Sequence, residues 1–236
     1  MIPKKIHYCW FGGKPLPNDI KQYIKSWKKY CPDYEIIQWN ESNYDLEKND
    51  YVKQAYENKK WAFLTDYIRL DVVYEYGGIY LDTDVELVKS LDNLLENKCY
   101  MGMEQIGTIA TGLGFGAEAG HPFLRKNMLH YEKNSFLENG SFKPPICVGV
   151  TTKLLRESGL VRENIIQDID GVMIYPTDYF CPLKMGTDKL TITSNTYSIH
   201  HYSASWYTGN KWIKRIKYRL IPLKIFVKKY ILLKDE

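Results

Sequence analysis

Gly77-Gly78-Ile79-Tyr80-Leu81-Asp82-Thr83-Asp84-Val85 places a short apolar run directly before two carboxylates. The run Ile79–Leu81 has the composition of a buried strand. Because side chains alternate along an extended chain, we expect Asp82 and Asp84 on one side of the backbone at the strand's end. Two carboxylates at such a position suit Mg²⁺ or Mn²⁺ held together with a phosphorylated substrate. The alternative is a solvated acidic turn without a ligand.

Strand-like and helix-like segments alternate on both sides of this stretch. We expect strands over 5–10, 34–39, 79–81, 85–88, 100–104, 113–117, 172–175 and 197–200. We expect helices over 19–30 (capped by Asn18), 51–60, 61–76, 122–137 and the second half of 147–159, a helical turn over 91–95 and a loop over 141–145. This order predicts one α/β domain with a mostly parallel central sheet flanked by helices.

Composition is compatible with that fold and excludes several protein classes. A length of 236 residues, with 44% apolar and 25% charged residues, is typical of one folded α/β domain. The five cysteines are scattered and form no CxxC pair, which argues against a disulfide framework or a zinc knuckle and favours a reducing compartment. No secretory leader or membrane-spanning run is recognised, so we expect a cytoplasmic location.

The last 26 residues differ from the rest in charge. Residues 211–236 hold nine basic and two acidic residues, a net charge of +7, whereas residues 1–210 carry −3 of the total +4. This segment also alternates basic with apolar residues. It is therefore predicted either to contact an anionic membrane surface at its cytoplasmic face or to pack an apolar helix face on the domain.

The end of the first expected strand offers a second part of a ligand site. Open α/β sheets bind ligands at the carboxyl ends of their strands, and Trp10-Phe11-Gly12-Gly13 follows the strand over 5–10. Trp10 can stack on a nucleobase or, equally, serve as a core aromatic. The two glycines form neither a GxGxxG nor a GKS/T pattern, so dinucleotide-binding and P-loop sites are unsupported.

Asp66 and Arg69 lie one helical turn apart in an otherwise apolar helix before the Asp pair. Charged groups on a buried helix face require partners. They can form a structural salt bridge. Alternatively, Asp66 can accept hydrogen bonds from sugar hydroxyls, and Arg69 can neutralise a departing phosphate.

The stretch His200-His201-Tyr202-Ser203-Ala204-Ser205-Trp206 follows the last expected strand. A histidine there is a candidate third metal ligand. Adjacent histidines point in opposite directions in an extended segment, so we expect only one of the two to face the metal. The remaining histidines, at positions 7, 121 and 130, are interpreted as structural.

Residues 61–70 and 76–84 resemble the sugar-binding DXD region of glycosyltransferase family 32, which includes α-mannosyltransferases and bacterial surface-polysaccharide transferases. Residues 2–13, 26–29, 32–35, 120–123 and 200–206 continue the resemblance. The catalytic domains of glucosylating bacterial toxins are similar more distantly. The resemblance covers residues 1–206 approximately and leaves out the basic tail.

The resemblance implies a GT-A fold over 1–210, a nucleotide-sugar donor, a divalent metal (Mn²⁺ or Mg²⁺) and retention of anomeric configuration. It implies that Asp66, Arg69, Asp82 and Asp84 are catalytic, and that Asp82, Asp84 and His201 bind the metal, although His200 aligns equally well. Donor contacts are assigned to Trp10, Tyr80, Asp82, Ser205 and Trp206.

The resulting functional hypothesis is transfer of a hexose, from a UDP-linked donor, to a glycan or lipid-linked saccharide during surface-polysaccharide (capsule) synthesis, without a nucleic-acid partner. One alternative is a phosphatase of the haloacid-dehalogenase type, in which an Asp-x-Asp also follows an apolar strand, but near the start of the domain. A second alternative is a non-enzymatic membrane-surface module, in which the four charged residues form structural ion pairs.

Overall fold

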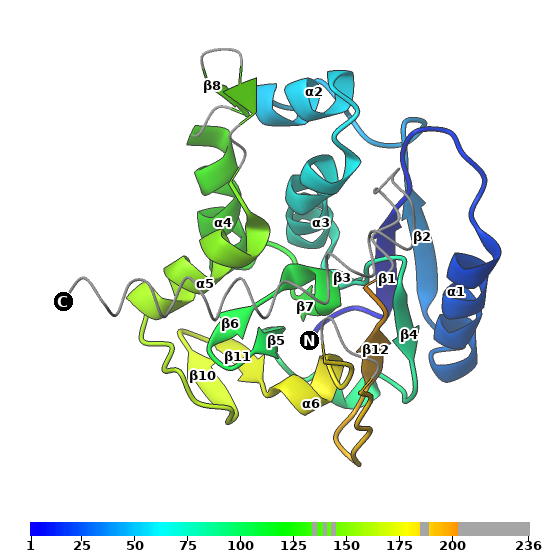
Figure 1. The fold of residues 1–236 in the computed structure, drawn as a ribbon, viewed down its shortest axis with the longest axis vertical. Coiled ribbons are helices and arrows are strands. Elements are labelled where there is room, and N and C mark those ends of the chain that lie inside the picture. Colours follow the sequence, from blue (N-terminus) through cyan, green and yellow to red (C-terminus); the bar gives the residue numbers. More distant parts are fainter. Residues whose placement is uncertain (134–135, 139–140, 143–144, 185–188, 203–236) are drawn as a thin grey trace.

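A computed structural model describes residues 1–133, 136–138, 141–142, 145–184 and 189–202 (Figure 1). The predicted boundary at residue 210, the basic tail over 211–236, Ser205 and Trp206 lie outside the described residues. The tail's contact with a membrane therefore stays a prediction.

The centre of the fold is an eight-stranded mixed sheet. The strand order is β10-β11-β5-β7-β3-β1-β2, with β6 paired to β5. Five strands (β2, β1, β3, β5 and β11) run in one direction, whereas β6, β7 and β10 run against them, so the predicted mostly parallel sheet is confirmed. The strands are β1 Lys5–Cys9, β2 Glu35–Trp39, β3 Gly78–Tyr80, β5 Cys99–Gln105, β6 Thr108–Ile109, β7 Phe115–Ala117, β10 Gln167–Ile169 and β11 Val172–Tyr175.

Two further strand pairs lie outside this sheet. β4 (Val85–Leu87) pairs in antiparallel fashion with β12 (Ser198–His200), although β12 follows it by more than 100 residues. Strands β8 (Leu137–Glu138) and β9 (Ser141–Phe142) form a short hairpin, which corrects the loop predicted over 141–145 and the helix predicted to extend to residue 137. The β4–β12 pair brings the end of the described chain back to the Asp82-Thr83-Asp84 stretch.

The helices are α1 Asn18–Tyr30, α2 Asp50–Glu57, α3 Trp61–Tyr76, α4 Pro122–Lys133, α5 Cys147–Glu157 and α6 Thr177–Phe180, with 3₁₀ turns η1 Asp92–Leu94 and η2 Thr111–Leu113. Two details correct the sequence predictions. Helix α5 begins at Cys147, whereas the sequence predicted a helix only in the second half of 147–159. Asn18 lies inside α1 and does not cap it, because the preceding Pro17 occupies the cap position without a side-chain hydrogen bond.

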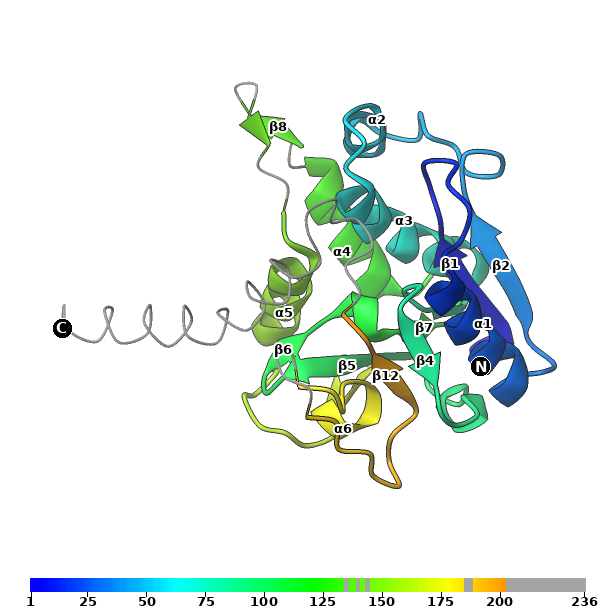
Figure 2. The same ribbon diagram turned by 45° about the vertical axis from the view of Figure 1, so that its right-hand side comes forward.

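Hydrophobic clusters cover both faces of the sheet. One joins the sheet to α2, α3, α4 and α5, and the other joins it to α1, β4, η1 and α6. Figure 1 shows α2–α5 gathered on one side and α1 on the other, and Figure 2 shows β12 beside β4. The molecule is therefore layered, and successive residues of β3 alternate between the two clusters.

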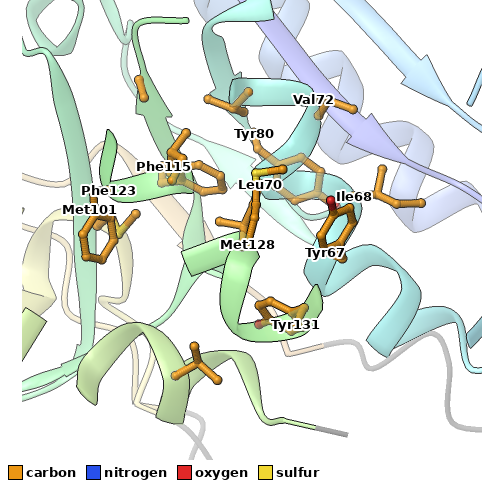
Figure 3. Close-up of a cluster of buried hydrophobic side chains, with 14 of the residues drawn as sticks. Tyr67, Ile68, Leu70, Val72, Tyr80, Met101, Phe115, Phe123, Met128 and Tyr131 are labelled. Atoms are coloured by element: carbon orange, nitrogen blue, oxygen red, sulfur yellow. The ribbon is translucent and has the colours of Figure 1, made fainter. Parts of the chain in front are cut away.

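Helix α3 lies at the centre of the larger cluster. Residues 66–73 are buried without interruption, as expected for a helix covered on all sides. Figure 3 shows α3 side chains, including Tyr67 and Leu70, meeting Tyr80 of β3 and side chains of α4. This packing fixes the helix that carries Asp66 and Arg69 against the strand that leads to Asp82.

The turn from α3 into β3 depends on two glycines. Gly77 and Gly78 have φ values of +62° and +110°, in the region that favours glycine. A Cβ atom on Gly78 would lie 2.9 Å from Nε2 of His7, which contacts the carbonyl oxygen of Gly77 at 2.8 Å. The predicted role of Gly77-Gly78 in ending the helix therefore has a steric basis.

In the part of the chain that the structure describes, no helix has the length and apolar character needed to cross a membrane.

Candidate active site

A cleft of about 440 Å³ opens where β1, β3 and β5 end. Elements from the whole length of the described chain contribute to its lining, which includes Trp10, Asp66, Arg69, Tyr80, Asp82, Asp84, Glu104, Gly112, Cys147, His200 and Tyr202. Six residues predicted from the sequence to form the site are thus gathered in one cleft, namely Trp10, Asp66, Arg69, Tyr80, Asp82 and Asp84.

Asp82 and Asp84 extend beyond β3 as the sequence predicts. Leu81 N still donates to the carbonyl oxygen of His7 at 3.0 Å, and a turn follows in which Val85 N donates to the carbonyl oxygen of Asp82 at 3.0 Å. The chain then enters β4 and pairs with β12. The two carboxylates therefore lie between the central sheet and the small β4–β12 sheet.

A candidate metal group consists of Asp82, Asp84 and His200, whose potential ligand atoms all lie within 4.8 Å of one another. Nε2 of His200 is 3.2 Å from Oδ1 of Asp84. Burial disfavours the charged imidazole, but the nearby Asp84 carboxylate outweighs burial and raises the pKa of His200. Two carboxylates and one imidazole form a donor set that fits Mn²⁺ or Mg²⁺, with room for a ligand's phosphate oxygens.

His201, rather than His200, was assigned to the metal group in the sequence prediction, and the structure separates the two. Nε2 of His201 contacts Glu86 at 2.8 Å, and its ring stacks on Tyr23 at a centroid distance of 4.5 Å. The alternation of the extended chain thus turns His200 toward Asp84 and His201 away from it. In this geometry His200 takes the position assigned to His201.

Arg69 links the two acidic parts of the cleft. Its Nη2 atom lies 3.2 Å from Asp66 and 3.2 Å from Asp82, and Nε donates to the carbonyl oxygen of Thr65 at 3.0 Å. Burial lowers the pKa of Arg69, but Asp82 and Asp66 outweigh this and hold it well above its usual value. A permanently charged guanidinium therefore faces the cleft beside the candidate metal group.

Asp66 is almost completely buried, and burial raises its pKa to about 6 even though Arg69 opposes the shift. Its carboxylate also accepts a hydrogen bond from the Cys147 thiol at the start of α5. Arg69 and Cys147 therefore do not fully offset the desolvation of the Asp66 carboxylate. Hydroxyl groups of a ligand could supply the missing hydrogen bonds.

Tyr80, which was expected to contact the nucleotide or the sugar, lines the cleft from a mostly buried position. Its side chain is only 1% exposed and its hydroxyl group bonds to Asp82 and to the Cys9 thiol. The Arg69 guanidinium lies 5.2 Å from the centre of its ring. Tyr80 therefore holds Asp82 and Arg69 in place from beneath the cleft.

Trp10 lies at the edge of the cleft, where β1 ends. Its Nε1 atom donates to the carbonyl oxygen of Lys14 at 2.5 Å, which anchors the indole to the following loop. Gly12 lies next to Trp61, because a Cβ atom there would be 3.2 Å from the Trp61 ring. The position of Trp10 is compatible with stacking on a base.

The sequence analysis missed several residues of the cleft. A Cβ atom on Gly112 would lie 2.5 Å from Oδ2 of Asp82, so glycine leaves the space that this carboxylate occupies. Glu104 near the end of β5 is largely buried, and burial raises its pKa. Cys147 and Tyr202 complete this set. Gly112 lies in the glycine-containing link between the strands expected over 100–104 and 113–117, which was the available signal for it, whereas Glu104 had none.

Residues 17–101 match a protein family described as the glycosyltransferase sugar-binding region containing the DXD motif. This part of the chain is therefore similar to the glycosyltransferase DXD region. The match ends shortly after Asp82 and Asp84 and includes Asp66 and Arg69. The resemblance inferred from the sequence is thereby confirmed.

Comparisons with individual proteins agree with this result. The chain is 32% identical over 131 residues to inositol phosphoceramide mannosyltransferase 3 of Schizosaccharomyces pombe, covering 52% of this chain and 35% of that protein. It is 26% identical over 234 residues to mannosyl phosphorylinositol ceramide synthase CSH1 of Saccharomyces cerevisiae, covering 89% of this chain and 54% of that protein. The chain thus spans about half of these relatives or less.

A solved structure titled PaToxG Glycosyltransferase superposes with a TM-score of 0.49 at 20% sequence identity, covering 66% of this chain and 69% of that chain.

Proposed function

We propose that this glycosyltransferase transfers a hexose from a nucleotide sugar to a hydroxyl group of a glycan or glycolipid, in a metal-dependent reaction on a GT-A type fold. The observation that carries the proposal is the convergence of Asp82, Asp84 and His200 beside Arg69 in one cleft. A nucleotide diphosphate leaving group needs concentrated positive charge, and this arrangement provides places for it.

Asp82, Asp84 and His200 would hold a divalent ion, which would supply Lewis-acid stabilisation of the diphosphate. Arg69 contributes a fixed positive charge from the protein itself. Asp66 accepts hydrogen bonds from hydroxyl groups of the donor sugar and so orients it. Trp10 stacks on the base at the other end of the cleft.

The names of the relatives support a glycolipid acceptor, since both refer to mannosylation of phosphoinositol ceramides. We propose a lipid-linked or polysaccharide acceptor for this chain as well, as in capsule synthesis, and a UDP-linked hexose as the donor. Retention of configuration completes the proposal, with the departing diphosphate receiving the proton of the attacking hydroxyl.

The test is a panel of nucleotide sugars, including UDP-glucose, UDP-galactose and GDP-mannose, incubated with the purified protein with Mn²⁺, with Mg²⁺ or with a chelator. We expect hydrolysis of one donor that requires the ion and is abolished by Asp84→Ala. Ion-independent hydrolysis, or no hydrolysis of any donor, contradicts the proposal. Phosphorylation of Asp82 during turnover would instead identify the phosphatase alternative.

The configuration of the released sugar is read by proton NMR during the first turnovers. Initial release with the same anomeric configuration as in the donor supports retention, and initial release of the opposite anomer excludes it.

A further inference from the structure

A partly buried carboxylate on the far side of the candidate metal group has no role in the reaction described so far. Glu104 lies near the end of β5, and in the sheet order β5 is separated from β3 by β7, on the side away from β1. Trp10, Asp82 and Glu104 therefore line the cleft in that order across the sheet. If the base lies at Trp10 and the diphosphate at Asp82, Glu104 lies beyond the diphosphate.

Among the described side chains, the Glu104 carboxylate accepts a hydrogen bond from one. Tyr202 hydrogen-bonds to it through its hydroxyl group, which also lies 2.9 Å from the Cys181 sulfur. Because an ionised carboxylate only accepts, Tyr202 donates to Glu104 and the thiol can donate to Tyr202. The His200 imidazole lies close enough to attract the Glu104 carboxylate electrostatically, but among the described residues no lysine or arginine forms an ion pair with it.

The backbone beside Glu104 is arranged to maintain this contact. Tyr202 has a φ of +51°, a value that is costly for a residue other than glycine. This conformation turns the chain directly after His200 and places the two rings 4.3 Å apart at an interplanar angle of 71°. Tyr202 therefore contacts both the candidate metal ligand and the carboxylate across the cleft.

A carboxylate with free acceptor positions binds groups that donate hydrogen bonds and repels phosphate. Hydroxyl groups of a sugar meet this requirement. The donor sugar already has Asp66 and Arg69 on the side of α3. We propose that Glu104, positioned by Tyr202, binds a hydroxyl group of the acceptor next to the attacking one and thereby selects acceptors with neighbouring hydroxyl groups.

This inference rests on the proposed function, and its test separates the two. The reaction is run with the donor that the panel identifies, with Mn²⁺ and with methyl glycosides of mannose, glucose and galactose as probes. The ratio of disaccharide to free sugar is measured for the wild type, Glu104→Gln, Tyr202→Phe and the control Glu163→Gln, whose side chain is exposed.

We expect Glu104→Gln to lower that ratio about tenfold, since a hydrogen bond to a charged group is lost. Donor hydrolysis without acceptor and the affinity for Mn²⁺ should stay within about twofold of the wild type. Tyr202→Phe, which keeps the ring on His200, should lower the ratio by a smaller factor, and Glu163→Gln should not change it.

A parallel fall of hydrolysis and transfer in Glu104→Gln, or an unchanged ratio, overturns the role of Glu104. Loss of Mn²⁺ binding in the same variant assigns Glu104 to the metal group and overturns it as well. By contrast, absence of ion-dependent hydrolysis in the wild type contradicts the proposed function itself.

Discussion

Helix α3 carries two buried aspartates, Asp66 and Asp71, whose partners differ in kind. Both oxygens of Asp71 lie 2.7 Å from the Lys48 ammonium, and the Tyr44 hydroxyl donates to it at 2.7 Å. Asp66 has one guanidinium contact at 3.2 Å and a thiol donor, and it lines the cleft. The first carboxylate is fully satisfied by the protein, whereas the second is not.

This difference separates a structural charge from a candidate functional one. Asp71 ties the chain before α2 to the middle of α3, so its contacts are expected to serve stability. Asp66 and the other acidic residues of the cleft lie near one another, and Arg69 does not neutralise all of them. Their repulsion lowers the stability of the fold, and the same negative charge favours binding of a cation and of hydroxyl donors. Substitutions in the two groups should therefore affect different measurements.

The largest effect is expected from Asp84→Asn in the cleft. Removal of one charge from the candidate metal group should lower ion-dependent turnover by about 10²–10³-fold, because stabilisation of the leaving diphosphate is lost. Initial rates across a Mn²⁺ titration measure this loss. Asp71→Asn is the matched control and should keep near wild-type turnover per folded molecule; equal losses in both variants would remove the distinction.

Asp66→Asn should lower turnover by about 10²-fold, because the amide replaces an acceptor for the donor sugar. Its stability should be unchanged or higher by about 1 kcal/mol, since a poorly satisfied buried charge is removed. Urea denaturation without added metal measures the stability. A destabilisation by several kcal/mol would show that Asp66 is structural, as Asp71 is expected to be.

Asp71→Ala should destabilise the fold by about 2 kcal/mol, through loss of charged hydrogen bonds from Lys48 and Tyr44. The midpoint of urea denaturation gives the change. Lys48→Met, which removes the partner cation, should destabilise as well. If Asp71→Ala were stable but had low activity, Asp71 would be a functional residue rather than a structural one, contrary to the difference drawn between Asp71 and Asp66.

The smallest effect concerns a third buried polar group, His7, which is satisfied in its neutral form. Nε2 contacts the Gly77 carbonyl oxygen at 2.8 Å, and Trp39 Nε1 donates to Nδ1 at 3.1 Å. Burial lowers the pKa of His7 from 6.5 to about 4. Below pH 6.5 the unfolded chain takes up a proton that the folded protein does not, so stability falls as the pH falls toward 4.

His7 should lower the free energy of unfolding by about 1 kcal/mol for each pH unit between pH 6.5 and pH 4. The measurement is the difference in unfolding free energy between the wild type and His7→Gln at pH 7, 6 and 5. The gap between the two proteins should narrow as the pH falls. A gap independent of pH would show that His7 keeps an ordinary pKa in the folded state.

Local patterns in the sequence were sufficient to predict the main elements of the fold. The apolar run at 79–81, the Gly77-Gly78 pair and the apolar helix over 61–76 each have a short-range signature, and β3 and α3 form where these predict. Interactions between distant segments were not predictable in this way. The expected strand at 85–88 forms, but it pairs with β12 outside the sheet because Val85 and Leu87 pack in the cluster beneath α1.

For the candidate site as well, residues with a local sequence signature were predicted, whereas contacts between distant segments were not. Asp66, Arg69, Asp82 and Asp84 belong to the stretch that carries the family resemblance, and the resemblance assigns all four to one site. The choice between His200 and His201 depends on the register of β12 on β4, in which His200 lies opposite Val85. Glu104 carries no local signal, since one acidic residue at a strand end is common on protein surfaces. Its hydrogen-bond partner, Tyr202, lies 98 positions further along the chain.

The candidate metal group forms only when β12 pairs with β4, and this pairing requires that nearly the whole domain has folded. Asp82 and His200 are 118 positions apart in the sequence, and closing a chain segment of that length costs about 4 kcal/mol of entropy. The three ligands exist together only after that cost has been met. An ion that binds them at 100 times its dissociation constant would return about 2.7 kcal/mol to the folded state. Ion binding and the docking of β12 are therefore thermodynamically linked, and each should strengthen the other.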